Sequence, residues 1–330
     1  MPEQKTENHG EKLPSKFWKR LLLSIIVGLA IFVGLSIYAD IQDVTQAFKE
    51  FRWGYVPLIL TLTLFNYLLR FYKWHYYLWN IGVKIKARDS LGIFLSGLSM
   101  SVTPAKLGEV FKSYLLKRLN GTEISRSVPV VFAERATDVL GLLILAAISF
   151  PALQYGKEVL VVLIAVPAFL LALIIAIQSR RLGNKLLRVV NSIPLVDRLS
   201  GGLRMTYDTF HTLFRFRTLI VATVVSVISW GFECLAMYFV LQGFGLSESV
   251  LLGTFVFSFS SLVGAVSMIP GGLIVAEGSS AGLLILAGIS KEIAASATMI
   301  IRFCTLWFGV VVGLITLFLI KDKLEKDAYF

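Results

Sequence analysis

Uninterrupted apolar runs constrain this chain more than any other feature of its sequence. A helix needs about 20 mostly apolar residues to cross a bilayer, and several runs here reach that length with almost no charge. Hydrophobic residues make up 56% of the chain and charged residues 16%, whereas soluble domains average about 45–50% and about 25%. The sequence therefore predicts an all-α, polytopic membrane bundle and excludes a soluble enzyme, a disordered chain and a secreted disulfide scaffold.

About six full membrane spans are predicted. They are residues 21–39, 55–79, 129–150, 159–177, 218–241 and 299–320. Two further apolar stretches fit poorly as simple crossings, because 91–104 is short and ends at Pro104, and 251–290 is broken by Pro270, Gly271 and Gly272. We predict both as re-entrant helical hairpins, although two crossings by 251–290 would agree equally well with the sequence.

The distribution of Lys and Arg predicts the orientation. With six crossings and two hairpins, 26 Lys and Arg residues fall on one side of the membrane and 4 on the other. Basic loops stay on the cytoplasmic side, so we expect a multi-pass cell-membrane protein with cytoplasmic tails at 1–20 and 321–330 around a membrane domain at 21–320. The loop 178–217 carries eight basic residues among spaced apolar ones, which favours amphipathic helices lying on anionic lipid headgroups.

The two halves of the membrane domain, about 55–177 and 218–320, show matching spacings. Pro104 precedes Arg135 by 31 residues, and Pro270 precedes Arg302 by 32. In the predicted topology the hairpins enter from opposite sides, as in an inverted repeat. Broken helices at mid-membrane are tolerated only in buried or water-lined places, where helix N-termini could bind an anion such as a lipid phosphate. The alternative is a compact bundle in which the breaks only kink helices.

Ionisable residues inside spans are energetically costly, at about 2.5–3.5 kcal/mol each on insertion scales, and therefore informative. Glu134, Arg135 and Asp138 lie in one predicted span. Arg135 could bind a headgroup phosphate, held by the carboxylates, or form a structural ion pair with them. Arg302 has no acidic neighbour within a turn, and symmetry makes Glu277 its predicted partner.

Other charged residues are predicted near the membrane surface. Lys106, Glu109 and Lys112 follow the first hairpin, either at the site or on a solvated interfacial helix. Glu233 is expected to reach the interface. The run 66–79 mixes basic and aromatic residues, which favours an aromatic belt with snorkelling cations over a nucleic-acid groove.

Catalytic signatures are missing from the sequence. It contains no GxGxxG, Walker A, HExxH or GxSxG motif, its three histidines are scattered, and its two cysteines lie in apolar runs. We therefore expect no enzymatic activity, metal or cofactor, and no nucleic-acid partner despite the net charge of +11.

Several short motifs, taken in order, resemble the lysylphosphatidylglycerol synthase transmembrane-domain family over about residues 20–320. They are R-x-x-x-W (Arg70, Trp74), TPAKLGE (103–109), E-R-x-x-D (Glu134, Arg135, Asp138), P-G-G-L-x-x-x-E (Pro270 to Glu277) and the late Arg302. The resemblance implies a flippase-like protein that moves aminoacylated or isoprenoid-linked lipids between leaflets. Synthase activity is not expected, because no soluble domain follows in this sequence. Ile274 stands where the family motif has a glycine.

Three functions remain open at this stage. The first is a flippase or scramblase for an anionic phospholipid or isoprenoid-linked lipid, the second an ion-coupled small-solute transporter, and the third a non-transporting subunit that recruits a lipid-modifying or glycosyltransferase enzyme. Assembly with such an enzyme or into a homo-oligomer is also left open. The residues predicted to handle substrate are Arg70, Lys106, Glu109, Glu134, Arg135, Asp138, Pro270, Gly271, Gly272, Glu277 and Arg302.

Overall fold

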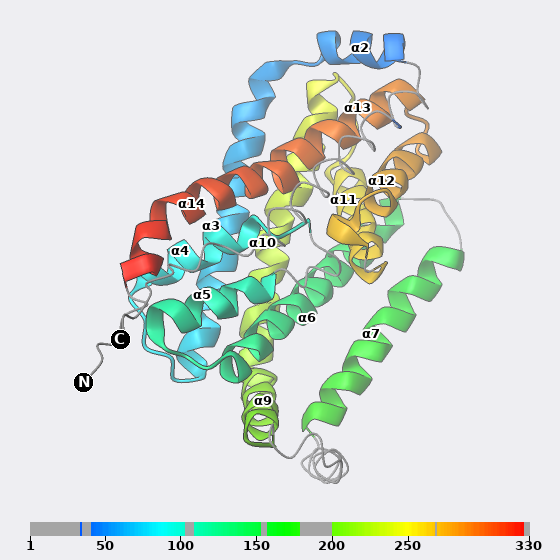
Figure 1. Ribbon diagram of the computed structural model, residues 1–330. Helices are drawn as coiled ribbons and strands as arrows, with labels where there is room; N and C mark the ends of the chain where they lie inside the picture. Colours follow the sequence, from blue (N-terminus) through cyan, green and yellow to red (C-terminus); the bar gives the residue numbers. More distant parts are fainter. Residues whose placement is uncertain are drawn as a thin grey trace, which may run out of the picture.

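The structure is a computed structural model that describes residues 34, 41–102, 109–152, 157–178, 200–267 and 269–326. Over these residues the chain is helical and contains no strand, which confirms the predicted all-α class (Figure 1). The principal helices, in chain order, are α2 (Ile41–Glu50), α3 (Val56–Asn80), α4 (Ala87–Leu98), α5 (Phe111–Asn120), α6 (Ile124–Ser149), α7 (Lys157–Gln178), α9 (Ser200–Leu213), α10 (Phe216–Gly243), α11 (Val250–Val266), α12 (Val275–Leu286), α13 (Lys291–Arg302) and α14 (Phe308–Lys326).

Within the part of the chain that the structure describes, three helical segments are long and apolar enough to cross a membrane: Trp53–Asn80, Phe216–Gly243 and Lys291–Ile320. They contain the predicted spans 55–79, 218–241 and 299–320. The last begins earlier than predicted, because Ser290 caps the N-terminus of α13 by accepting a hydrogen bond from the backbone N–H of Ile293. The predicted spans 129–150 and 159–177 are helical as α6 and α7, whereas the prediction for 21–39 falls almost wholly outside the described residues.

The long helices approach one another through small side chains. α10 contacts both α3 and α6, and Asn66 of α3 donates a hydrogen bond to the carbonyl of Ser229 in α10 at 2.9 Å. A Cβ atom on Gly141 of α6 would lie 2.9 Å from Cβ of Ser226. Only glycine permits that approach, as is common between helices in membranes.

The predicted hairpin 251–290 contains two short helices, α11 and α12, whereas the predicted hairpin 91–104 contains only the greater part of α4, and α5 lies beyond its bounds. The pair α4 and α5 and the pair α11 and α12 lie on opposite sides of the long helices (Figure 1). α4 contacts α5, and α11 contacts α12. Between α11 and α12 the chain turns through the short helix η5 (Pro270–Gly272). One hydrophobic cluster surrounds α4 and α5, and a second surrounds α11 and α12. The two breaks meet, since a Cβ atom on Gly271 would lie 3.4 Å from Cα of Val102.

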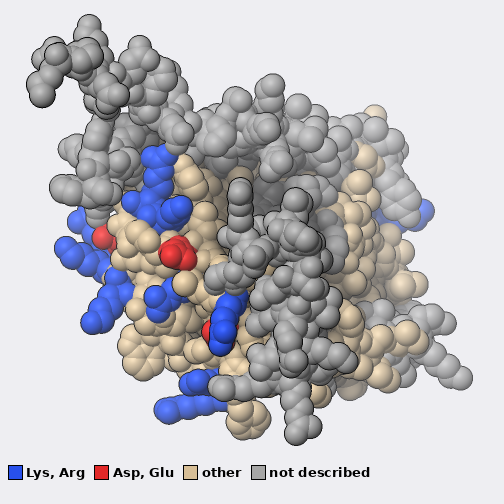
Figure 2. Space-filling view, turned by 60° about the horizontal axis from the view of Figure 1, so that its bottom comes forward, with Lys and Arg blue, Asp and Glu red and all other residues tan. Residues whose placement is uncertain are grey.

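Basic side chains gather at the end of the bundle that lies at the bottom of Figure 1 and comes forward in Figure 2. The exposed ones follow α3 (Lys84, Lys86, Arg88), end α5 (Lys117) and lie in or after α9 (Arg204, Arg215, Arg217). The loop 178–217 was predicted to lie on lipid headgroups. Its described part differs in one respect, because α9 contacts α6 and both Leu213 and Phe214 are buried in the protein.

Candidate functional site

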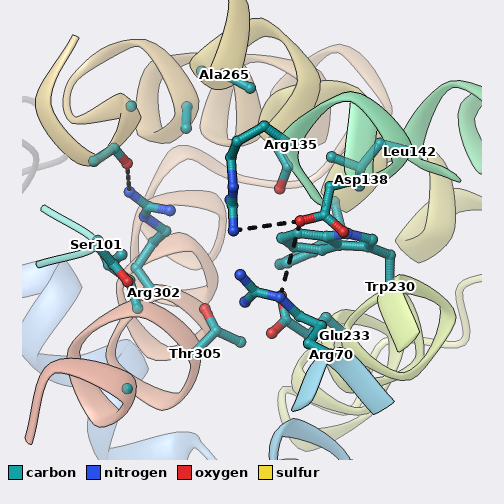
Figure 3. A pocket seen from close by; sticks show the side chains of 18 of the residues that line it. Arg70, Ser101, Arg135, Asp138, Leu142, Trp230, Glu233, Ala265, Arg302 and Thr305 are labelled. Atoms are coloured by element: carbon teal, nitrogen blue, oxygen red, sulfur yellow. Dashed lines mark hydrogen bonds and ion pairs between the residues drawn. The ribbon is translucent and has the colours of Figure 1, made fainter. Parts of the chain in front are cut away.

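A cavity of about 180 Å³ lies where the two breaks meet the long helices. Three arginines from three different helices line it: Arg70 of α3, Arg135 of α6 and Arg302 at the end of α13. Figure 3 shows all three side chains extending into this space, with Asp138, Trp230 and Glu233 on one side of it. The cavity therefore brings together charged residues that are far apart in the sequence.

α6 supplies Arg135 and Asp138, and ion pairs and hydrogen bonds to neighbouring helices hold both side chains in place. Nη2 of Arg135 lies 2.7 Å from Oε2 of Glu109 and 3.5 Å from Oδ2 of Asp138. The other oxygen of Asp138, Oδ1, accepts a hydrogen bond from Nζ of Lys73 at 2.5 Å. Lys73 also donates to Oγ of Ser226 at 2.7 Å. Asp138 is thus held from α3 and α10 while its second oxygen stays beside Arg135.

A second ion pair lies behind this group. Nζ of Lys112 in α5 donates to Oε2 of Glu134 at 2.6 Å and lies 3.8 Å from Oε2 of Glu109. The same ammonium stacks over the ring of Trp74, 4.5 Å from its centre, a favourable cation–π geometry. Glu134 therefore pairs with Lys112 and, unlike Asp138, does not line the cavity.

In the second half of the chain, Arg302 joins two partners across the break. Nε of Arg302 donates to Oε1 of Glu277 at 2.6 Å, and Nη2 donates to the carbonyl of Gly271 at 2.8 Å. The predicted pairing of Arg302 with Glu277 is confirmed. Gly271 has φ +61°, a conformation that glycine adopts without strain. A π-helical turn, Phe303–Trp307, follows Arg302 directly, and such turns are frequent at functional sites.

The cations are more exposed than the acids around them. The side chains of Arg135, Arg302 and Arg70 keep 21%, 16% and 9% of their surface exposed, whereas those of Glu109, Asp138 and Glu277 keep 3–5%. The acids are therefore more deeply buried than the arginines that they hold in place, although Glu109 and Asp138 also line the cavity. A molecule in the cavity would meet guanidinium groups first, which suits an anion.

The remaining predicted site residues lie in or beside the break. Gly271 and Gly272 line the cavity, and Pro270 belongs to the same short helix η5. Lys106 lies outside the described residues, so its predicted place at the site stays a prediction.

Burial decides between the two alternatives left open for Glu109 and Lys112, and it corrects the predicted surface positions of Glu233, Arg70 and Lys73. Glu109 and Lys112 are buried, so they are not on a solvated interfacial helix. Glu233 is 4% exposed and lines the cavity instead of reaching the membrane interface. In the run 66–79, Arg70 and Lys73 are buried in the bundle and so do not snorkel to an aromatic belt.

Lys73 and Trp230 are site residues that the sequence reasoning missed. Lys73 could have been found, because Arg70, Lys73, Trp74 and Tyr77 follow the helical spacing of a single face, and that face is buried. Trp230 carries no comparable signal, since it lies in a span that is apolar on every side.

Known membrane proteins are similar in sequence to this chain over most of its length. The family model described as the lysylphosphatidylglycerol synthase TM region matches residues 25–313. A UPF0104 membrane protein of Methanothermobacter thermautotrophicus is 26% identical over 89% of this chain and 90% of its own length. One from Pyrococcus horikoshii is 25% identical over 89% of this chain and 95% of its own. One from Methanocaldococcus jannaschii is 29% identical over 69% and 96%. The chain therefore belongs to the lysylphosphatidylglycerol synthase transmembrane-region family of membrane proteins.

Proposed function

We propose that this protein is a lipid flippase or scramblase without enzymatic activity, in which the cavity receives the headgroup of an anionic lipid. One observation carries the proposal: three arginines face a single cavity, and their side chains are more exposed than those of Glu109, Asp138 and Glu277, the acids that they contact. A guanidinium offers a planar, forked set of donors that matches phosphate oxygens. Arg135 and Arg302, the most exposed of the three, would hold the phosphate.

The surroundings of the cavity support a lipid over a soluble anion. Large apolar side chains beside the break are exposed, namely Ile269, Ile274 and Phe303. In a membrane these side chains would contact acyl chains while the headgroup occupies the polar cavity. An ion-coupled solute transporter has less support, because Glu109, Asp138 and Glu277 each lie within 2.7 Å of a basic side chain and would have to leave it to carry a proton or cation.

We further propose that α4 with α5, and α11 with α12, are re-entrant hairpins related as an inverted repeat. The contact between Val102 and Gly271 supports this arrangement, because hairpins entering from opposite faces would meet at their tips near mid-membrane. The basic end of the bundle would then face the cytoplasm.

Transport of a labelled phospholipid in reconstituted vesicles tests the function. We expect vesicles containing the protein to expose an inner-leaflet lipid with a fluorescent acyl chain to an external quencher faster than protein-free vesicles do. Arg135→Lys should slow this exposure about tenfold, because an ammonium lacks the fork. Arg204→Lys, on the exposed side of α9, is the matched control and should leave the rate unchanged. Equal rates with and without protein would contradict the proposal, and would favour a non-transporting subunit.

A further inference from the structure

An open groove of about 440 Å³ lies at the basic end of the bundle, apart from the central cavity. Its lining consists of His75, Trp79, Val83, Lys84, Ile85 and Lys86. None of these six residues lines the central cavity. The proposed transport of a lipid through that cavity does not use the groove, so the chemistry of the groove requires an explanation of its own.

The segment that carries the two lysines is held in place by neighbouring helices. The backbone N–H of Val83 donates a hydrogen bond to the carbonyl of Leu78 in α3 at 2.9 Å. The side-chain amide of Asn120, at the end of α5, donates to the carbonyl of Lys84 at 2.9 Å. A ligand of the groove would therefore meet a segment that is already ordered, which lowers the entropic cost of binding.

Several groups that favour an anion converge on this groove. Lys84 and Lys86 are both exposed. Helix α4 begins directly after Lys86 and has no side-chain cap, so its first backbone N–H groups and the positive end of its dipole remain available to an anion. Nδ1 of His75 lies 3.0 Å from Oγ of the buried Ser90. This contact leaves the other ring nitrogen of His75, Nε2, as the one that can meet a ligand.

An exposed apolar stripe on α3 leads from the groove along the membrane-length segment Trp53–Asn80. Phe65, Leu68, Tyr72 and Trp79 are all exposed, and their spacing places them on one face of the helix. Trp79 lies near the end of the segment, and tryptophan rings commonly lie at the level of the lipid headgroups. A molecule with an anionic end and a long apolar tail would match both the groove and the stripe.

We propose that the groove binds the headgroup of an anionic phospholipid from the leaflet at the basic end, as a resident lipid that is not transported. The phosphate contacts Lys84, Lys86 and the N-terminus of α4, and one acyl chain lies along the stripe on α3. A soluble acidic partner would use the lysines but not the stripe, which lies at membrane depth. The proposal does not depend on the proposed function, because the groove and the central cavity share no lining residue.

Quenching of tryptophan fluorescence by brominated lipids tests the site. The full chain is reconstituted in phosphatidylcholine bilayers that contain equal small amounts of phosphatidylglycerol or phosphatidylcholine brominated near the carboxyl end of the acyl chains. We expect brominated phosphatidylglycerol to quench more strongly, with about tenfold tighter binding than phosphatidylcholine, because two lysines attract the anionic headgroup. Trp79→Phe should abolish this difference in quenching, since Trp79 is the tryptophan that lines the groove.

Two double variants separate the groove from the general charge of the basic end. Lys84→Gln with Lys86→Gln should reduce the preference for phosphatidylglycerol to about twofold or less. Lys117→Gln with Arg204→Gln is the matched control, because both residues are exposed at the same end but do not line the groove, and it should keep the preference.

Equal quenching of the wild type by the two brominated lipids would overturn the site. A preference that persists in Lys84→Gln with Lys86→Gln, or one that falls equally in the control variant, would also overturn it. A preference that persists in Trp79→Phe would place the anionic lipid elsewhere, such as in the central cavity, and would leave the proposed function standing without the groove.

Discussion

At the residue scale, the two central arginines differ in how much the fold depends on them. Arg302 donates in two directions, to Glu277 and to the carbonyl of Gly271, whereas the ion pairs of Arg135 with Glu109 and Asp138 both involve one nitrogen, Nη2. A lysine in place of an arginine can keep a single ion pair, but it cannot donate in two fixed directions as the planar guanidinium does. Arg302→Lys should therefore lower the free energy of unfolding by about 1–3 kcal/mol, the cost of an unsatisfied buried carbonyl. Arg135→Lys should lower transport with little change in melting temperature.

Measuring both variants for transport rate and thermal stability separates the two roles. A stable Arg135→Lys protein with full transport would reduce Arg135 to a link between helices. A fully stable Arg302→Lys protein would show that the bond to Gly271 contributes nothing to the break.

Ile274 is the one described non-glycine residue with a positive φ, at +71°. A β-branched side chain in that region is strained, at a cost of about 1–3 kcal/mol. The side chain is 61% exposed, so little packing would be lost on its removal. Ile274→Gly should therefore raise the free energy of unfolding by about 1 kcal/mol after the entropy of glycine is subtracted. Val224→Gly is the matched control, because Val224 is 51% exposed in the interior of helix α10, and it should lower the free energy of unfolding by about 1 kcal/mol.

The sequence could predict which ionisable residues are important at this scale, but not all of their partners. Burying a charge is costly wherever it lies, so Arg135 and Arg302 could be recognised from the sequence, and symmetry gave Glu277. The partner of Glu134 depends on where α5 lies against α6, and no local spacing encodes that contact. The burial of Lys73 likewise depends on Asp138, which is 65 residues away.

At the element scale, the second hairpin depends on a close approach between α11 and α12. A Cβ atom on Gly264 would lie 2.9 Å from Cβ of Ala276 and 3.4 Å from Cα of Gly272. Gly264→Ala should therefore force the helices apart and destabilise by about 1–3 kcal/mol. On α12, a Cβ on Gly282 would meet nothing within 4 Å, so Gly282→Ala should be neutral or stabilising by up to about 1 kcal/mol. Melting temperatures of the two alanine variants check the difference, and equal values would mean that the hairpin packs loosely.

The pair between Lys112 and Glu134 links α5 to α6 behind the cavity. Removing one partner leaves the other charge buried without its counter-ion. Glu134→Leu, which leaves the ammonium of Lys112, should therefore lower the free energy of unfolding by about 3–5 kcal/mol. Replacing both with apolar residues of similar size should recover much of that loss. The double variant Lys112→Met, Glu134→Leu should therefore melt above Glu134→Leu and still transport lipid. A double variant that is stable but inactive would place this pair in the transport machinery.

Element boundaries were predictable where polar residues or caps interrupt an apolar run. The positions of α3 and α10 agree with the sequence prediction within a few residues. The length of the last segment was underestimated, because its first turns, 291–298, are polar yet continue the helix from the Ser290 cap. How the two broken segments are placed against each other could only be suggested by their matching spacings.

At the scale of the whole molecule, basic side chains are concentrated at one end. Lys84, Lys86 and Arg88 follow α3 at that end, and α9 adds Arg204. The residues between α10 and α11 at the other end contain no Lys or Arg. Some cations counted as cytoplasmic in the sequence are buried near the cavity, including Lys73 and Lys112. The two ends still differ in basic charge when these buried residues are left out, because the exposed Lys and Arg side chains alone make one end more basic.

Labelling of single introduced cysteines in intact cells tests the orientation that this asymmetry implies. Thr45→Cys and Ser247→Cys occupy exposed positions at the less basic end and should react with a membrane-impermeant maleimide. Lys86→Cys and Arg204→Cys should react only after permeabilisation, because positively charged loops stay in the cytoplasm. Cys234 and Cys304 are buried, so the parent protein should give little background. Reaction at Lys86→Cys from outside would reverse the orientation. Reaction from outside at Arg204→Cys but not at Lys86→Cys would mean that an odd number of crossings separates them, so that either the hairpin assignment of α4 and α5 or the crossing by α6 or α7 would fail.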